Sequence, residues 1–470
     1  MHERDLRRVA LESGKTTSRK AKAKAFSSRS SQAGSTANSP SVSPNHSPGG
    51  SRAGSRAVSR HGSEDDSDES DDLTSSVASL DIKEFSKYEK ADAEVAFSDL
   101  RDVSEQIIER TRTKRNTTEA REENLAVYTN ILRAQYAPGE IDPLLADLIP
   151  ALLKCFRAGS AEGETIYALK ALSMTVLTMN SGDEPFVDVQ DALRSRIQDA
   201  SSRKAQETAM HTLGICAFFG GADVQDVEDI MDFFLDIIET DGESIEANDS
   251  AAVVSAALQA WGFLATMFED LEGKTDRPLE CFENQLDSSH FAVQQAAAEN
   301  IALLYEQSWT QKEDDETADV GSDHYEHGSF QRKHWKQRYS PYHNNADEYS
   351  VKAKLSDISR STARHVAKDK RKALHQVAKD VLHTIEHPYR GPRFSTAIDE
   401  DDVHYLGHRL TVRFGGRSSG MDLVLDRWWK YHRYEAVKRA VAGGFVEHYS
   451  KNMLIRNAIP RGTLVAPTDF

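Results

Sequence analysis

Lysine and arginine side chains gather at two places in the last third of the chain. The first group lies where a helix is expected to begin and consists of Lys368, Lys370, Arg371 and Lys372. The second group alternates with aromatic residues and includes Arg427, Trp428, Lys430, Arg433, Lys438 and Arg439. Phosphates attract Lys and Arg, and unpaired bases stack on aromatic rings. These ten residues are therefore predicted to form a nucleic-acid or partner interface.

Two amphipathic helices would position these side chains, over 364–386 and about 421–441. In the first, basic charge at the helix start opposes the helix macrodipole, so stability is a poor reason for it and an acidic or phosphate partner is favoured. In the second, apolar and aromatic residues recur every three or four positions. Aromatic residues at helical spacing more often fill a core. Packing of Trp428 and Tyr434 against the rest of the protein is therefore the alternative.

Signatures of catalysis are missing from the sequence. Gly14-Lys15-Thr16-Thr17 imitates the end of a phosphate-binding loop, but Val9 stands where the motif needs glycine. His324, His327 and His334 have no cysteine partners, and His404 and His408 lack the glutamate of a zinc-protease motif. The sequence predicts that the protein is not an enzyme and has no metal, cofactor or small-molecule substrate.

An Ala-rich helical pattern recurs through the middle of the chain. Its anchor positions are Ile131, Leu172, Leu213, Trp261 and Ile301, separated by 41, 41, 48 and 40 residues. This period is typical of armadillo and HEAT repeats. Other apolar stretches, such as 143–153 and 230–238, suit the first helix of each pair. We predict an all-α, armadillo/HEAT-like helical-repeat solenoid; an irregular helical bundle is the alternative.

The charge distribution divides the chain into a basic start, an acidic middle and a basic end. Residues 1–62 hold 12 Lys and Arg against 3 Asp and Glu, residues 63–328 hold 20 against 57, and residues 329–470 hold 26 against 15. The acidic middle, densest over 223–246, is either a solvated face or a docking face for a basic partner.

Four segments follow from composition: a disordered tail over 1–90, the repeats over 91–310, a polar linker over 311–363, and a basic helical C-terminal domain over 364–470 with an insertion at 387–420. The tail is Ser- and Arg-rich and then acidic. Its candidate phosphorylation sites precede proline or acidic residues: Ser39, Ser43, Ser47, Ser63 and Ser67.

Cysteine usage and hydropathy indicate the compartment. Cys155, Cys216 and Cys281 each lie within an apolar helical pattern, so buried free thiols in a reducing compartment are expected. No run is long and apolar enough to span a bilayer, and the N-terminus lacks the apolar core of a secretory signal. We expect a cytoplasmic or nuclear protein, or one present in both, with no membrane contact.

The order of these parts resembles the interferon-related developmental regulator family. A tail with Ser63-Glu64-Asp65-Asp66 precedes the helical repeats, and Lys368-Asp369-Lys370-Arg371-Lys372 leads into a helix. The blocks Trp428-Trp429-Lys430-Tyr431-His432-Arg433, Gly443-Gly444-Phe445 and Asn452-Met453-Leu454-Ile455-Arg456 follow. The resemblance covers roughly residues 60–310 and 364–457.

This resemblance implies an armadillo-like fold and two non-enzymatic activities. One is ribosome binding, through rRNA and ribosomal proteins, that restrains translation. The other is transcriptional co-regulation, in which the protein is a nuclear scaffold that recruits histone-deacetylase co-repressor complexes. Rigid repeats with a basic helical end favour the ribosome hypothesis.

Overall fold

The computed structural model describes residues 88–89, 92–110, 117–157, 161–271, 274–307, 309–310, 340–341, 345–361, 368–388, 390–398, 405–414 and 422–461. The chain divides into two compact units, Met1–Asp72 and Leu73–Phe470, and every described residue belongs to the second. The five candidate phosphorylation sites, the Gly14–Thr17 segment and the histidines at 324, 327, 334 and 404 lie outside the described residues. So does the predicted tail, except for Tyr88 and Glu89.

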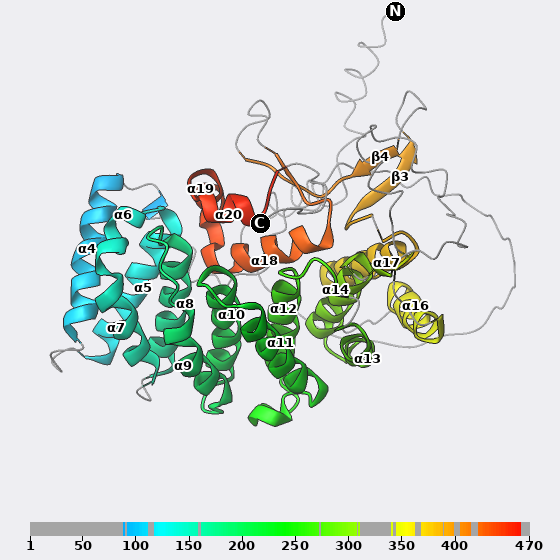
Figure 1. Cartoon of the computed structure of the whole chain (residues 1–470), viewed down its shortest axis with the longest axis horizontal. Helices are drawn as coiled ribbons and strands as arrows, with labels where there is room; N and C mark the ends of the chain where they lie inside the picture. The colour runs from blue at the N-terminus through cyan, green and yellow to red at the C-terminus, as the bar shows by residue number, and fades with distance from the viewer. Residues whose placement is uncertain are drawn as a thin grey trace, which may run out of the picture. The chain divides into compact units, whose positions relative to one another are not determined.

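Ten helices form five antiparallel pairs in chain order. The first helices of the pairs are α4 (Ala93–Arg110), α7 (Leu145–Arg157), α9 (Phe186–Gln198), α11 (Val224–Glu239) and α13 (Asp276–Gln285). The second helices are α5 (Thr118–Ala134), α8 (Glu162–Thr178), α10 (Arg203–Phe219), α12 (Ala251–Ala265) and α14 (Phe291–Gln307). Each second helix packs on the next, as Figure 1 shows. This succession confirms the predicted helical-repeat fold.

Small and large residues alternate along the faces that join the second helices. All five predicted anchors are fully buried, as are Ala168, Ala209, Ala257 and Ala297. Small side chains let neighbouring helices approach, and the large anchors fill the space between them. The three cysteines are also buried and free, as predicted.

Buried polar side chains join neighbouring second helices as well. Tyr128 and Thr175 share a hydrogen bond of 2.8 Å between α5 and α8, and Ser173 donates to Thr212 at 3.0 Å between α8 and α10. Asn300 donates to the Leu258 carbonyl at 2.9 Å, which joins α14 to α12. Because a buried polar group without a partner is costly, these pairs help to fix the register between repeats.

A sixth helical pair follows the five that the sequence predicts. It consists of α16 (Asn345–Arg360) and α17 (Lys368–Glu386), which pack on each other, and α17 also packs on α14. Lys354 of α16 forms an ion pair of 3.2 Å with Glu283 in α13 and one of 2.9 Å with Asp287, just after α13. The predicted linker therefore contains a repeat helix at its end; residues 311–339 of that linker lie outside the described residues. The apolar face of α16 is short and consists of the buried residues Val351, Leu355 and Ile358.

The segment after α17 begins with short antiparallel ribbons. Strand β3 (Phe394–Ile398) pairs with β4 (Tyr405–His408), and β5 (Thr411–Val412) pairs with β6 (Leu423–Val424). A third ribbon joins β1 (Trp309–Thr310) to β2 (Ser340–Pro341). Within the described residues, the predicted insertion over 387–420 thus contributes strands.

The chain then returns across the repeats. Helix α18 (Trp428–Val441) contacts α14, α12, α10, α8 and α5, and it is followed by η5 (Ala442–Gly444), α19 (Phe445–Lys451) and α20 (Met453–Ala458). Figure 1 shows α18 lying across the ends of the second helices. We call residues 422–461 the C-terminal segment. This segment belongs to the same compact unit as the repeats, because its apolar face is buried on them. The sequence analysis had assigned it to a domain of its own.

Three further short helices lie in the loops between repeat helices: α6 (Pro138–Ile141), η1 (Asp142–Leu144) and η2 (Glu243–Ile245). The last occupies the acidic loop that lengthens one repeat step to 48 residues. Among the described helices, none is long and apolar enough to cross a bilayer.

Replacement of Leu213 by aspartate should unfold at least its own repeat. Leu213 is fully buried in α10, and an unpaired carboxylate at that position costs several kcal/mol. Urea denaturation followed by circular dichroism measures the loss. Val187→Asp is the control, because Val187 is 68% exposed. Equal stability of the two variants would contradict the repeat register.

Candidate functional site

The first basic group lies at the start of α17. Lys368, Lys370 and Lys372 are exposed, and Arg371 is half-buried. The opposite face of α17 is buried through Leu374, Ala378, Val381 and Ile385. The amphipathic pattern thus turns the apolar side toward the repeats and leaves the lysines on the solvent side. This surface, Lys368–Lys372, is called the α17 basic surface below.

The second basic group lies mostly inside the protein. Lys430 is fully buried, and its Nζ lies 2.6 Å from Asp426 Oδ1. Burial lowers the pKa of Lys430, and Asp426 opposes that effect. Trp428 is also buried, and its Nε1 donates to Thr384 Oγ1 of α17 at 2.8 Å. These two side chains attach α18 to the molecule.

Arg433 binds the end of a repeat helix. Its guanidinium donates to the Thr266 carbonyl at 2.6 Å and to Thr266 Oγ1 at 3.0 Å, directly after α12. It also donates to the Ala458 carbonyl at 3.0 Å and lies over the rings of Phe218 and Trp429. Arg433 therefore joins three parts of the chain.

The other cations of α18 are half-buried. The Nζ of Lys438 is 5.2 Å from the Tyr434 ring centre and 3.8 Å from Glu435 Oε1. Arg427 stands at the N-cap of α18, and Arg439 lines a cavity beneath the helix. Tyr434 is buried, so Trp428 and Tyr434 both pack as the alternative interpretation proposed. Binding of nucleic acid or of a partner by these ten residues stays a prediction.

Two buried glutamates of α14 hold the start of α18. Glu306 accepts hydrogen bonds from the backbone N–H groups of Trp428 at 2.9 Å and Trp429 at 3.0 Å. Helix N-termini leave such donors unpaired, and a carboxylate there also opposes the positive end of the macrodipole. One turn further along α18, the Tyr431 hydroxyl donates to the Glu299 carboxylate at 2.9 Å. His432 Nε2 donates to the backbone carbonyl of Glu299 at 3.3 Å.

The other end of the C-terminal segment is held on α5 and α8. His448 Nε2 donates to the Leu132 carbonyl at 2.8 Å, and Asn452 Nδ2 donates to the Leu177 carbonyl at 2.6 Å. Arg133 returns a hydrogen bond of 3.0 Å from its Nε to the Ala440 carbonyl. The approach is so close that a Cβ on Gly444 would lie 1.7 Å from the Arg133 carbonyl oxygen.

Burial changes the ionisation of several groups at this contact. Desolvation raises the pKa values of Glu299 and Glu306 to about 7 and lowers that of His432 to about 4. The three shifts share one cause, because charged forms are disfavoured where water is excluded. Near neutral pH the contact therefore holds a neutral His432 and two carboxyls close to their titration points.

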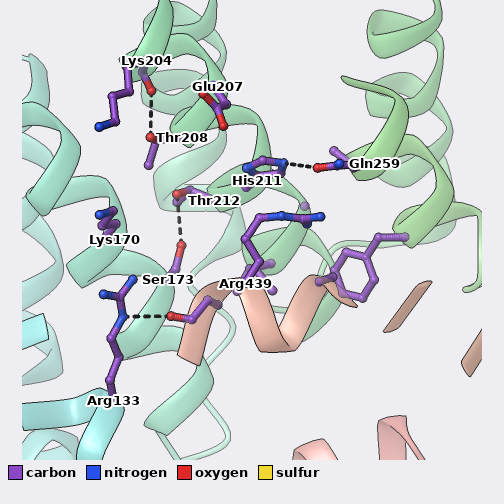
Figure 2. Close-up of a pocket in the computed structure, with 16 residues that line it drawn as sticks. Arg133, Lys170, Ser173, Lys204, Glu207, Thr208, His211, Thr212, Gln259 and Arg439 are labelled. Atoms are coloured by element: carbon purple, nitrogen blue, oxygen red, sulfur yellow. Dashed lines mark hydrogen bonds between the residues drawn. The ribbon is translucent and has the colours of Figure 1, made fainter. Parts of the chain in front are cut away.

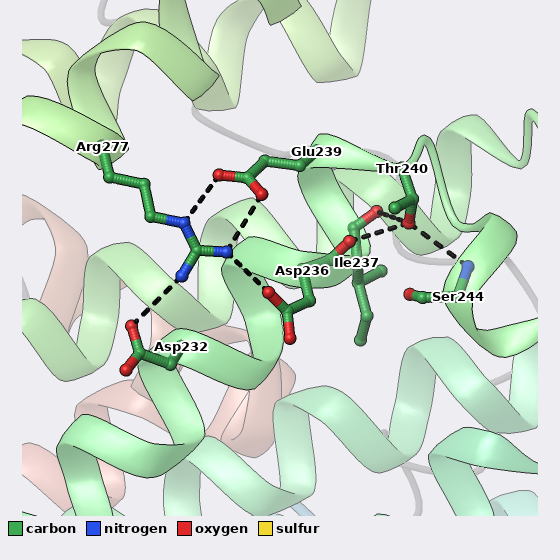
Figure 3. Close-up of polar contacts among 7 residues, drawn as sticks. All are labelled: Asp232, Asp236, Ile237, Glu239, Thr240, Ser244 and Arg277. Atoms are coloured by element: carbon green, nitrogen blue, oxygen red, sulfur yellow. Dashed lines mark hydrogen bonds and ion pairs between the residues drawn. The ribbon is translucent and has the colours of Figure 1, made fainter.

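The acidic surface of α11 is partly neutralised by one arginine of the next repeat. Figure 3 shows Arg277 of α13 donating to Glu239 at 2.8 Å and to Asp236 at 2.6 Å. It also lies 3.6 Å from Asp232. Side-chain hydrogen bonds from Arg277 lower the pKa of Glu239. Glu228 of α11 also pairs with Lys274, whereas Asp229 is exposed.

The sequence analysis missed the groups that hold the C-terminal segment. Glu299 and Glu306 stand seven residues apart in the apolar pattern of α14, so both lie on the same helix face. Two carboxylates on a buried helix face indicate that hydrogen-bond donors from another part of the chain pack against that face. No comparable pattern pointed to His448 or Asn452, whose partners lie 316 and 275 residues away.

Together these features define a class: a helical-repeat protein whose own C-terminal segment is bound across the ends of its repeats. The sequence model of the interferon-related developmental regulator family matches residues 64–386, more than half of the chain. The chain therefore belongs to this family. The match ends at residue 386, where α17 ends.

Relatives found by sequence comparison agree with this assignment. An uncharacterized protein of Schizosaccharomyces pombe is 24% identical over 337 residues, which are 72% of this chain and 69% of that protein. Interferon-related developmental regulator 2 of Mus musculus is 23% identical over 68% of this chain and 64% of its own length. Interferon-related developmental regulator 1 of Homo sapiens is 21% identical over 67% and 61%. The last two alignments thus span less than two thirds of those relatives.

Removal of the Glu306 carboxylate should weaken the attachment of α18. The variant Glu306→Ala leaves two backbone donors without their partner, and loss of a helix cap costs about 0.5–2 kcal/mol. Chemical denaturation of the full chain measures the change in the free energy of unfolding. Glu280→Ala is the matched control, because Glu280 is exposed on α13. A Glu306 variant as stable as that control would contradict the capping role.

Stability should also depend on pH through the same residue. The folded pKa of Glu306 is raised from 4.5 to about 7, so the stability linked to this shift is present below pH 4.5 and is lost as pH rises through 7. Compared with Glu306→Gln, the unmodified chain should therefore lose unfolding free energy between these values, by at most about 1.4 kcal/mol per pH unit. Denaturation curves at several pH values test this. A difference that stays constant would show that Glu306 does not titrate there.

Proposed function

We propose that this protein is a non-enzymatic regulator that binds ribosomes and thereby restrains translation. Its relatives are named as regulators, which supports the general role. The observation that carries the ribosome hypothesis is the α17 basic surface. Three exposed lysines stand within the first five residues of a helix, where positive charge is unfavourable for the helix itself. An external polyanion such as rRNA compensates for that placement.

The distribution of the other charges supports the same proposal. The cations of α18 are half-buried or buried, so the α17 basic surface is the better candidate for phosphate contact. Exposed acidic side chains on and beside α11, such as Asp229 and Asp223, suit the basic surfaces of ribosomal proteins by electrostatic complementarity. A rigid array of repeats can present both surfaces to one large ribonucleoprotein partner.

The second candidate is a nuclear scaffold that recruits histone-deacetylase co-repressor complexes. The acidic α11 surface favours it equally, because basic chromatin proteins would be suitable partners. The α17 basic surface has no evident use in a scaffold that acts through proteins alone. For this reason we place ribosome binding first.

Charge reversal on the α17 basic surface should weaken ribosome binding and its dependence on salt. The variant Lys370→Glu with Lys372→Glu removes two cations, and each lost phosphate contact reduces the salt slope by roughly 1. Co-sedimentation of the full chain with purified ribosomes at several salt concentrations gives the slope. The matched control is Arg101→Glu with Lys154→Glu, which makes the same charge change on exposed residues of α4 and α7.

Equal slopes for both double variants would remove the α17 basic surface from the interface. A chain that stays out of the ribosomal fractions at low salt, and that captures deacetylase subunits from extract instead, would support the scaffold and contradict the ribosome proposal. Substitutions in α18 are unsuitable for this experiment, because Lys430 and Arg433 also hold the fold together.

A further inference from the structure

A cavity of about 170 Å³ lies between the second helices of successive repeats and α18 (Figure 2). Residues of α8, α10 and α12 form its walls. Arg133 of α5 and Arg439 and Ala440 of α18 close it on the remaining side. The cavity is separate from the α17 basic surface, and none of the functions considered above uses it.

Hydrogen bonds between the helices fix the walls. Ser173 donates to Thr212 at 3.0 Å between α8 and α10, and His211 Nε2 and Gln259 Oε1 lie 3.1 Å apart between α10 and α12. The bond from Arg133 to the Ala440 carbonyl holds α18 in place beside them. The cavity is therefore preformed, which reduces the entropic cost of binding a ligand there.

Positive charge is in excess around this cavity. Its lining contains four cationic side chains, Arg133, Lys170, Lys204 and Arg439, and a single carboxylate, Glu207. His211 adds no charge near neutral pH, because burial lowers its pKa well below the usual value. This surplus stands within a repeat region, residues 91–310, that carries 40 acidic residues against 16 basic ones. A solvated acidic surface does not account for it.

Within the part of the chain that the structure describes, Arg439 has no direct partner for its guanidinium. Among the described residues, it makes no hydrogen bond or ion pair, and Glu435, Glu299 and Glu207 act on it only through longer-range attraction. Figure 2 shows its side chain extending from α18 toward α10. A guanidinium has five N–H donors, and it binds the oxygens of phosphate groups especially well. An oxygen-rich anion in the cavity would supply the missing acceptors.

Apolar side chains form another part of the lining. Phe263, Ala260 and Ile215 lie there, and the Phe263 ring is stacked on Phe218 with centres 4.6 Å apart. Such a wall accommodates carbon atoms better than bare inorganic ions. Cationic groups beside an apolar wall are the combination that binds a charged group carried on an organic body.

We propose that this cavity binds a small organic phosphate, whose phosphate oxygens are held by Arg439, Lys170 and Lys204. The organic part lies toward Phe263. A phosphate monoester carries about −1.5 to −2 charges near neutral pH, which suits the net positive lining. The phosphate can belong to a free nucleotide or to a phosphorylated serine, since both present the same group. This proposal does not depend on ribosome binding.

Isothermal titration calorimetry of the full chain at physiological salt tests the proposal. The probes are adenosine monophosphate and O-phosphoserine, with adenosine and succinate as the uncharged and carboxylate controls. We expect at least one phosphate compound to bind and adenosine not to bind. Binding of the nucleotide alone identifies the first source, and binding of phosphoserine alone identifies the second.

Substitutions then locate the site. Arg439→Gln and Lys204→Gln should each weaken binding by about tenfold or more, whereas Arg456→Gln, an equal charge change on exposed α20, should leave it unaltered. Lys204 is exposed, so its variant remains informative if Arg439→Gln fails to fold. The proposal is overturned if neither phosphate compound binds at millimolar concentration. It is also overturned if succinate binds as tightly or if all three variants bind alike.

Discussion

The unpaired carbonyls at the ends of the repeat helices set the constraint on which the rest of the structure depends. An α-helix leaves its last four carbonyl oxygens without internal partners. Two such oxygens, in α5 and α8, accept hydrogen bonds from His448 and Asn452 of the C-terminal segment, and the carbonyl of Thr266, the C-cap of α12, accepts one from Arg433. In return, Glu306 of α14 caps the first N–H groups of α18. The repeats and the C-terminal segment therefore complete each other's helix ends.

This mutual capping decides which charges face outward. Arg433 and Lys430 carry the residue types of a nucleic-acid interface, but the repeats use them as attachments. Capping also places Arg439 over the second helices, where it closes a cavity that the repeats alone would leave open. The lysines at the start of α17, by contrast, are exposed on the surface. Division of the basic residues between attachment and surface thus follows from the fold.

The repeats could be predicted from sequence because their signal is local. Alanines such as Ala168 and Ala209 recur with large anchors one turn later, and that spacing specifies both the helix face and the next contact. Helix α16 was missed because its apolar face is limited to Val351, Leu355 and Ile358 within a polar stretch. The attachment of α18 was only partly predictable. Burial of Trp428 followed from its helical spacing, but no local pattern specifies that His448 meets a carbonyl of α5.

The central claim is that residues 428–459 are an integral part of the repeat array. Hydrogen exchange of the full chain under native conditions, followed by mass spectrometry, tests it most directly. If capping joins the two parts, the amides of α18 should be protected to the same degree as those of α10 and α12, and all three should exchange together as denaturant is added. Rapid exchange throughout α18, with α10 and α12 still protected, would show that the segment lies on the repeats without stabilising them.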